Sequence, residues 1–130
     1  MRHHAIIALS TASICLCSTA ALAASWVNLG RDAAGTIWYV DRDTVTRTDG
    51  FALVWVREDG RHNRQVRWSE LKSRKKIDCA RGKIMDLGTI MYDAKGRILK
   101  RVPGPDKPGD AAMDPIVPGS MGEAMAQAVC

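Results

Sequence analysis

Four cysteines and three histidines are the residues of this chain best suited to bind a metal ion or to act as nucleophile and base. Protein zinc sites use three or four nitrogen and sulfur ligands, so the count alone allows a zinc site. The positions argue against it, because two histidines and two cysteines fall within residues 1–17. That segment has the features of an export signal, so we expect cleavage to separate these four residues from the later cysteines and histidine.

Residues 1–23 have the three parts of a secretory signal peptide. Arg2 and two histidines form a cationic head, an apolar stretch follows, and Ala21-Leu22-Ala23 supplies the small-x-small pattern that signal peptidase cleaves. A transmembrane anchor is the alternative, but the apolar run is short, diluted by serine and threonine, and lacks a basic stop-transfer flank. We expect residues 1–23 to be a signal peptide and residues 24–130 to form one exported domain.

The mature domain would keep a single histidine, His62, and two cysteines, Cys79 and Cys130. Because compartments beyond the inner membrane are oxidising, we predict a disulfide between these two cysteines. The bond would close a loop of about 50 residues and contribute roughly 4 kcal/mol in the chain-entropy model. Two free buried thiols are the alternative.

Catalytic chemistry finds little support in the mature sequence. General acid–base catalysis near neutral pH usually uses a histidine or a perturbed carboxylate, and His62 lies in a Gly60-Arg61-His62-Asn63 segment typical of an exposed turn. Two pairs of carboxylates are close in sequence, Asp41 with Asp43 and Glu58 with Asp59, but both fit turn and strand-end chemistry. We predict no catalytic residue, metal or cofactor. A small periplasmic hydrolase or nuclease with His62 as its base remains the alternative.

Positive charge is concentrated between Arg57 and Lys83. This segment holds ten basic and four acidic residues, so its formal charge of +6 exceeds the +4 of residues 24–130. Such a cluster can attract acidic polysaccharide or anionic lipid. Nucleic acid is not expected, because an exported protein seldom meets it and no aromatic-basic platform is evident in the sequence. The candidate binding residues are Lys72, Arg74, Lys75, Lys76, Arg81 and Lys83.

The same cluster has a structural explanation. Its densest part, Lys72 to Lys76, is expected at a strand-to-loop junction, where lysines on an exposed edge would keep two sheets from pairing. The four tryptophans also allow two interpretations, a carbohydrate platform or core packing, and their strand positions favour the core. They are Trp26, Trp38, Trp55 and Trp68.

The elements that would carry these residues are short strands between acidic-glycine turns, as in an antiparallel meander. Phe51–Val56 is apolar on both faces, which is typical of a central strand covered on both sides. Apolar and polar side chains alternate along residues 64–71, which favours a strand with one solvent-exposed face. The expected strands are 26–29, 36–41, 51–58, 64–71, 83–92 and 97–102.

The carboxyl-terminal third predicts a connector and then a helix. All five prolines lie between residues 103 and 118, where they would interrupt sheet hydrogen bonding. Ser120 and Glu123 have the spacing of a capping box, and an apolar stripe follows at helical spacing up to Cys130. A helix of about 10 residues is marginal alone, so it must dock on the sheet. The fold class is therefore α+β: an antiparallel sheet of about six strands with a disulfide-tethered carboxyl-terminal helix.

Several short motifs, taken in order, resemble the surface-adhesin protein E family of Gram-negative bacteria. Each motif is short, but their order and the final cysteine are specific, and together they cover nearly all of residues 24–130. The motifs are Trp26-Val27-Asn28-Leu29-Gly30, Trp38-Tyr39-Val40-Asp41, Val54-Trp55-Val56, Ile77-Asp78-Cys79, Tyr92-Asp93-Ala94-Lys95-Gly96, Val117-Pro118-Gly119-Ser120 with Glu123, and Val129-Cys130.

The resemblance implies an antiparallel sheet with a disulfide-tied helix, exposure at the cell surface, a homodimer, and binding to host matrix proteins such as vitronectin and laminin. With the charge pattern, it leads to the hypothesis of an exported, non-enzymatic module that binds a matrix protein or an acidic polysaccharide. The periplasm, the cell surface and the medium are all open as destinations. A structural envelope protein without an adhesive role is the further alternative.

Overall fold

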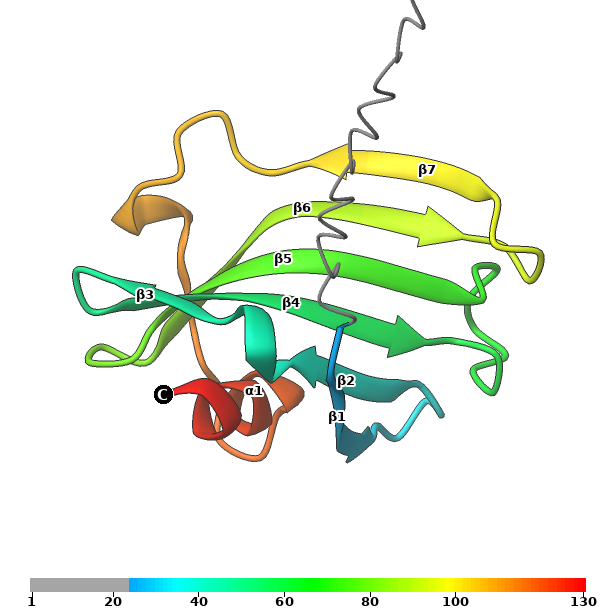
Figure 1. The fold of residues 1–130 in the computed structure, drawn as a ribbon, viewed down its shortest axis with the longest axis horizontal. Helices are drawn as coiled ribbons and strands as arrows, with labels where there is room; N and C mark the ends of the chain where they lie inside the picture. Colours follow the sequence, from blue (N-terminus) through cyan, green and yellow to red (C-terminus); the bar gives the residue numbers. More distant parts are fainter. Residues whose placement is uncertain (1–23) are drawn as a thin grey trace, which may run out of the picture.

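The computed structural model describes residues 24–130, so the expected signal peptide lies outside the described residues. The described chain forms one antiparallel sheet and one α-helix (Figure 1). The elements are β1 (Trp26–Arg31), β2 (Ile37–Asp41), β3 (Thr46–Thr48), β4 (Phe51–Asp59), β5 (Glu70–Asp78), β6 (Lys83–Tyr92), β7 (Ile98–Pro103), β8 (Asp114–Pro115) and α1 (Met121–Val129), with short 3-10 turns at Arg42–Thr44 and Asp110–Ala112.

The main path of the sheet is β1-β2-β4-β5-β6-β7, with β3 added beside β4 and β8 beside β6. Every pair is antiparallel, and short turns join β1 to β2, β3 to β4, β5 to β6 and β6 to β7. At the β3–β4 turn, Asp49 and Gly50 both have positive φ, as a two-residue hairpin requires. The predicted fold class, a sheet of about six strands with a carboxyl-terminal helix, is confirmed.

The strand predicted at 64–71 is wrong. The chain from Gly60 to Ser69 is a connection, and the next strand, β5, begins at Glu70. Buried Asn63 organises this connection, since its side-chain amide donates to the Thr36 hydroxyl and its carbonyl accepts from the backbone of Gln65. The aromatic residue that suggested a strand, Trp68, lies against Gly60, where a methyl group would clash with the indole.

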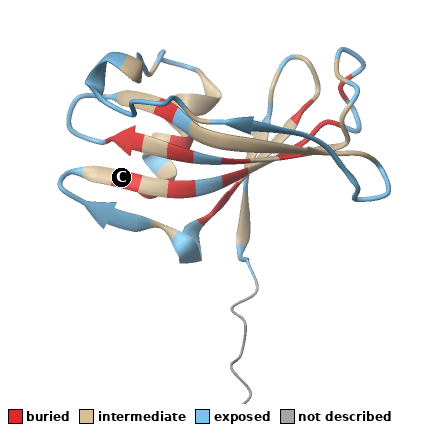
Figure 2. Ribbon diagram, turned by 90° about the horizontal axis from the view of Figure 1, so that it is seen from above, coloured by how far each residue is buried: buried red, intermediate tan, exposed pale blue. Residues whose placement is uncertain are grey.

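The sheet has two faces of different character. Along β4, Ala52, Val54 and Val56 are buried on the face that α1 covers, called here the helix face, while the intervening side chains point to the opposite, outer face. Met125 and Val129 of α1 complete the core on the helix face. Figure 2 shows the resulting alternation of buried and exposed residues along the central strands. The helix therefore covers one face of the sheet, and β4 is not covered on both sides as its sequence suggested.

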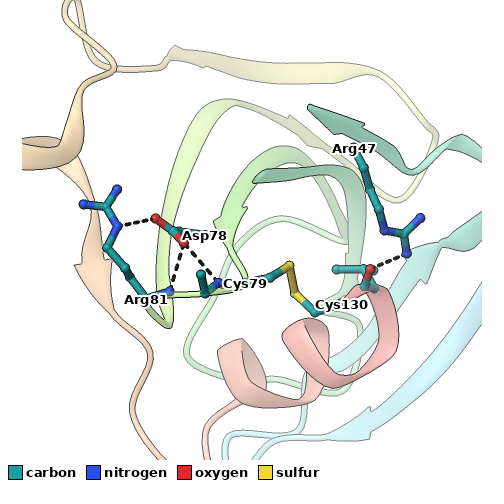
Figure 3. The surroundings of a disulfide bond; sticks show 7 residues. Arg47, Asp78, Cys79, Arg81 and Cys130 are labelled. Atoms are coloured by element: carbon teal, nitrogen blue, oxygen red, sulfur yellow. Dashed lines mark hydrogen bonds and ion pairs between the residues drawn. A yellow bond between two sulfur atoms is a disulfide. The ribbon is translucent and has the colours of Figure 1, made fainter. Parts of the chain in front are cut away.

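The helix is anchored at both ends. Ser120 accepts a hydrogen bond from the Glu123 amide, and the Glu123 carboxylate accepts from the Gly119 amide, so the predicted cap forms with its return bond one residue earlier. At the other end, Cys130 is bonded to Cys79, which confirms the predicted disulfide (Figure 3). Arg47 of β3 donates to the Val129 carbonyl beside it.

Candidate functional site

The densest part of the basic cluster lies along β5, in the interior of the sheet. β5 pairs with β4 on one side and with β6 on the other, so the predicted strand-to-loop junction and the exposed-edge explanation are both wrong. Because side chains alternate along a strand, Lys72, Arg74 and Lys76 point to the outer face. Lys75 points to the helix face, where it is buried.

The remaining candidate cations hold parts of the fold together. Lys75 forms an ion pair with Asp86 on β6. At the β5–β6 turn, Arg81 contacts Asp78 at 2.6 Å and Asp110 at 3.0 Å, and Lys83 contacts Asp110 at 3.1 Å. These pairs tie the proline-rich connector to the turn that carries Cys79. The structure thus divides the six predicted residues into three on the outer face and three with structural partners.

Aromatic side chains stand beside the cations of the outer face. The Arg57 guanidinium lies 4.1 Å from the centre of the Tyr39 ring and 5.4 Å from that of Trp26. Lys72 lies 5.3 Å from the Tyr92 ring, and Lys76 lies 3.9 Å from the Phe51 ring. Cations at such distances are attracted to the electron-rich faces of the rings, which fixes their position. An aromatic-basic surface that the sequence did not reveal is therefore present on this face.

Trp55 is the aromatic residue that this face leaves most open. Its side chain lies directly across the β4–β5 pair from Arg74, and 37% of Trp55 is exposed. Trp38 packs against the core as predicted, and its indole donates to Asp32 at 2.9 Å. The prediction of core packing is therefore wrong for Trp55, because the strand parity of β4 turns it away from α1.

Two shallow grooves meet at Trp55. The first, of about 390 Å³, lies over β5, β6 and β7 and includes Arg74, Gly88 and Arg101. The second, of about 370 Å³, runs the other way towards Trp26 and includes Asp41 and Lys72. Trp55 and Ile90 line both grooves, so the indole forms the ridge between them.

A third cavity on this face, of about 310 Å³, is lined by groups that neutralise one another. Arg61 donates to Asp59, and this hydrogen bond is the main reason why the pKa of Asp59 falls to about 2. Glu70 contacts Lys72 at 3.1 Å and Arg57 at 3.8 Å. Little uncompensated charge is left at this end of the outer face for a ligand.

The structure also shows where the candidate residues for catalysis, metal binding and membrane insertion lie. His62 is exposed in the β4–β5 connection. Within residues 24–130, no three side chains of the metal-binding types gather closely enough to share an ion. The single α-helix of this region is too short to cross a bilayer.

Sequence patterns could have located part of this surface. Trp55 and Arg57 alternate with two valines in the sequence, which could have indicated that the two residues share one face. The apolar residues on both faces of Phe51–Val56 obscure this pattern. Ile90 and Arg101 carry no such signal, because they join the site only through the pairing of β5 with β6 and of β6 with β7.

Similarity to known proteins extends over most of the described chain. Among solved structures, the chain is similar to the crystal structure of protein E from non-typeable Haemophilus influenzae, with 13% sequence identity, a TM-score of 0.48, and coverage of 83% of this chain and 76% of that chain. Comparison with curated protein sequences gave no match. A family model described as surface-adhesin protein E matches residues 26–130. The chain therefore belongs to the surface-adhesin protein E family.

Proposed function

We propose that this protein is an exported, non-enzymatic adhesin module that binds an acidic partner, in the extracellular matrix or the bacterial envelope, on its outer face. One observation carries the proposal. Lys72, Arg74 and Lys76 stand side by side on an interior strand, on the face that the helix leaves open. Membership of the surface-adhesin family supports a binding role rather than a catalytic one.

The charge available to a partner is greatest around Arg74 and Arg101. Both residues are exposed, and neither takes part in any ion pair found among residues 24–130. Arg101 lies across the β6–β7 pair from Ile90, and Ile90 lies across the β5–β6 pair from Lys72, so the sheet brings three cations to one area. Such a field draws an anionic partner and weakens with added salt.

Export is part of the proposal. The predicted cleavage after Ala23 would place a new amino terminus at Ala24, which lines the second groove beside Trp26 and Asp41. The liberated ammonium group would add one more cation to the rim of the outer face. A disulfide that holds the fold together also favours an oxidising destination, which for this family means the periplasm, the cell surface or the medium of a Gram-negative bacterium.

The homodimer implied by the family resemblance stays a prediction. Edge strand β7 offers a place for it, because Ile98, Leu99 and Val102 are exposed there. An edge strand also presents unpaired backbone groups to which another strand can add.

Changing Lys72, Arg74 and Lys76 together to alanine is expected to reduce binding to heparin, laminin or vitronectin by at least about tenfold at low salt. The reason is that three favourable charge contacts are lost, each worth up to about 1 kcal/mol in water. Solid-phase binding at about 0.05 M and 0.5 M salt would measure both the loss and its salt dependence.

The matched control removes the same charge elsewhere. Arg64, Lys95 and Lys100 are exposed and lie in the β4–β5 connection, the β6–β7 turn and the opposite face of β7. Their triple alanine variant should bind almost as well as the unchanged protein. Equal losses of binding in both variants would mean that only net charge matters. Binding that neither variant nor added salt reduces would refute the proposal.

A further inference from the structure

We propose that the first groove, between Trp55 and Arg101, is a subsite for one sugar unit of an acidic polysaccharide. The indole of Trp55 packs against the apolar face of the sugar ring, while Arg74 and Arg101 bind its carboxylate or sulfate group. This inference rests on the proposed function and names the partner class of the same surface. Its support comes from the shape of the groove, its charge and the chemistry of its walls.

The shape of the groove follows from strand register. Trp55 lies opposite Arg74, Arg74 lies opposite Gly88, and Gly88 lies opposite Pro103. This row crosses four strands, spaced about 4.8 Å apart, and Gly88 contributes no side chain in the middle of it. A Cβ built at Gly88 would meet only backbone atoms, the nearest at the ordinary contact distance of 3.7 Å, so no side chain stands within 4 Å of that position. The bare part of the floor therefore lies at Gly88, between Arg74 and Pro103.

Charge separates this groove from the second groove and the third cavity. Two arginines and no acidic residue line it, whereas the second groove contains Asp41 and the third cavity contains Asp59, Glu70 and Asp93. An anion is therefore favoured in the first groove and opposed by carboxylates in the others. The floor at Gly88 lies between the two guanidinium-bearing strands, β5 and β7.

The types of residue favour a sugar over an acidic protein segment. An exposed indole presents a flat, electron-rich face, which attracts the slightly positive C–H groups of a sugar ring. Arginine, unlike lysine, presents a planar fork of donors that matches carboxylate and sulfate oxygens in pairs. Ile90 gives the remaining wall an apolar surface. A polyanion without a ring would use the arginines but gain nothing from Trp55.

Calorimetric titration with three probes tests this assignment. The probes are a heparin oligosaccharide, which carries sulfate, a hyaluronan oligosaccharide, which carries carboxylate alone, and polyglutamate, an anion without sugar. Trp55→Ala is expected to weaken binding of at least one oligosaccharide by about five- to tenfold and to change polyglutamate binding less than about twofold. Because heparin carries carboxylate as well as sulfate, a loss with heparin alone would indicate that sulfate is bound, whereas a loss with both oligosaccharides would indicate that a carboxylate suffices.

Two further variants serve as controls. Trp55→Phe keeps an aromatic face and should retain most of the sugar affinity, while Val117→Ala truncates an exposed apolar residue outside the groove and should change little. Oligosaccharide affinity unchanged in Trp55→Ala, or an equal loss for polyglutamate, would overturn the inference. The proposed function would survive that result if the Lys72, Arg74 and Lys76 variant still lost binding, and would fail only if it did not.

Discussion

Replacing Cys79 and Cys130 together with alanine is expected to lower the free energy of unfolding by about 4 kcal/mol. The two cysteines are 51 residues apart in the sequence, so the bond restricts a large loop in the unfolded chain. It also holds α1, which has 9 residues and depends on Met125 and Val129 for its contact with the sheet. A loss of this size is a large share of the stability of a small domain.

The expected fall in melting temperature is on the order of 15–30 °C, because each kcal/mol corresponds to several degrees in a domain of this size. Thermal melts followed by circular dichroism, with and without reductant, would measure it. Reductant should destabilise the unchanged protein and leave the double alanine variant unaffected. Equal melting temperatures for the oxidised and reduced protein would contradict the stabilising role of the bond.

The second large effect concerns Glu58, a carboxylate on the helix face of β4. Only 9% of Glu58 is exposed, and burial raises its pKa from 4.5 to about 7, although the charge of nearby Lys75 acts in the opposite direction. Asp86 and Asp32 add to the rise through like-charge repulsion. The native protein therefore holds a proton that the unfolded chain releases at lower pH.

The sign of the pH dependence follows from this difference. Since the native state binds more protons between pH 4.5 and about pH 7, the stabilising contribution of protonated Glu58 is complete below pH 4.5 and is lost as the pH rises through 7. The loss amounts to about 3 kcal/mol at most. Glu58→Gln carries no such charge and is expected to be more stable than the unchanged protein at pH 8, by roughly 2–3 kcal/mol.

Urea denaturation at pH 5 and pH 8 would test this prediction. The unchanged protein should lose stability between the two values, and Glu58→Gln should lose much less. Asp106→Asn, an exposed change in the connector, provides the control and should follow the unchanged protein. If Glu58→Gln were the less stable form at pH 8, burial would not be the dominant influence on this carboxylate.

Local chemistry explains which elements the sequence could predict. The aspartate-glycine turns before β2, β4 and β7, the Ser120 cap and the paired cysteines each act through neighbouring residues or through a fixed covalent bond, and these predictions are confirmed. β5 was missed because Ser73 and Lys75 occupy inward positions and break its apolar alternation. The lysine is accommodated by its ion pair with Asp86 on the neighbouring strand, which no local pattern reveals.

The candidate site was only partly predictable for a related reason. Composition located the charge near residues 57–83, but the register of β5 decides which cations share a face. It brings Lys72, Arg74 and Lys76 together and turns Lys75 away. The strand position of Trp55 predicts a place in the core, and only the position of α1 shows which face of β4 is covered.

Lysine-acylation footprinting, read by mass spectrometry with and without a saturating heparin oligosaccharide, tests most directly whether the outer face is the binding surface. The structure places Lys72 and Lys76 on that face, Lys95 in the β6–β7 turn, and Lys100 on the opposite side of β7 from Arg101. Bound ligand is predicted to slow the acylation of Lys72 and Lys76 and to leave Lys95 and Lys100 unchanged. Protection of Lys95 and Lys100 in place of Lys72 and Lys76 would contradict the assignment of this face.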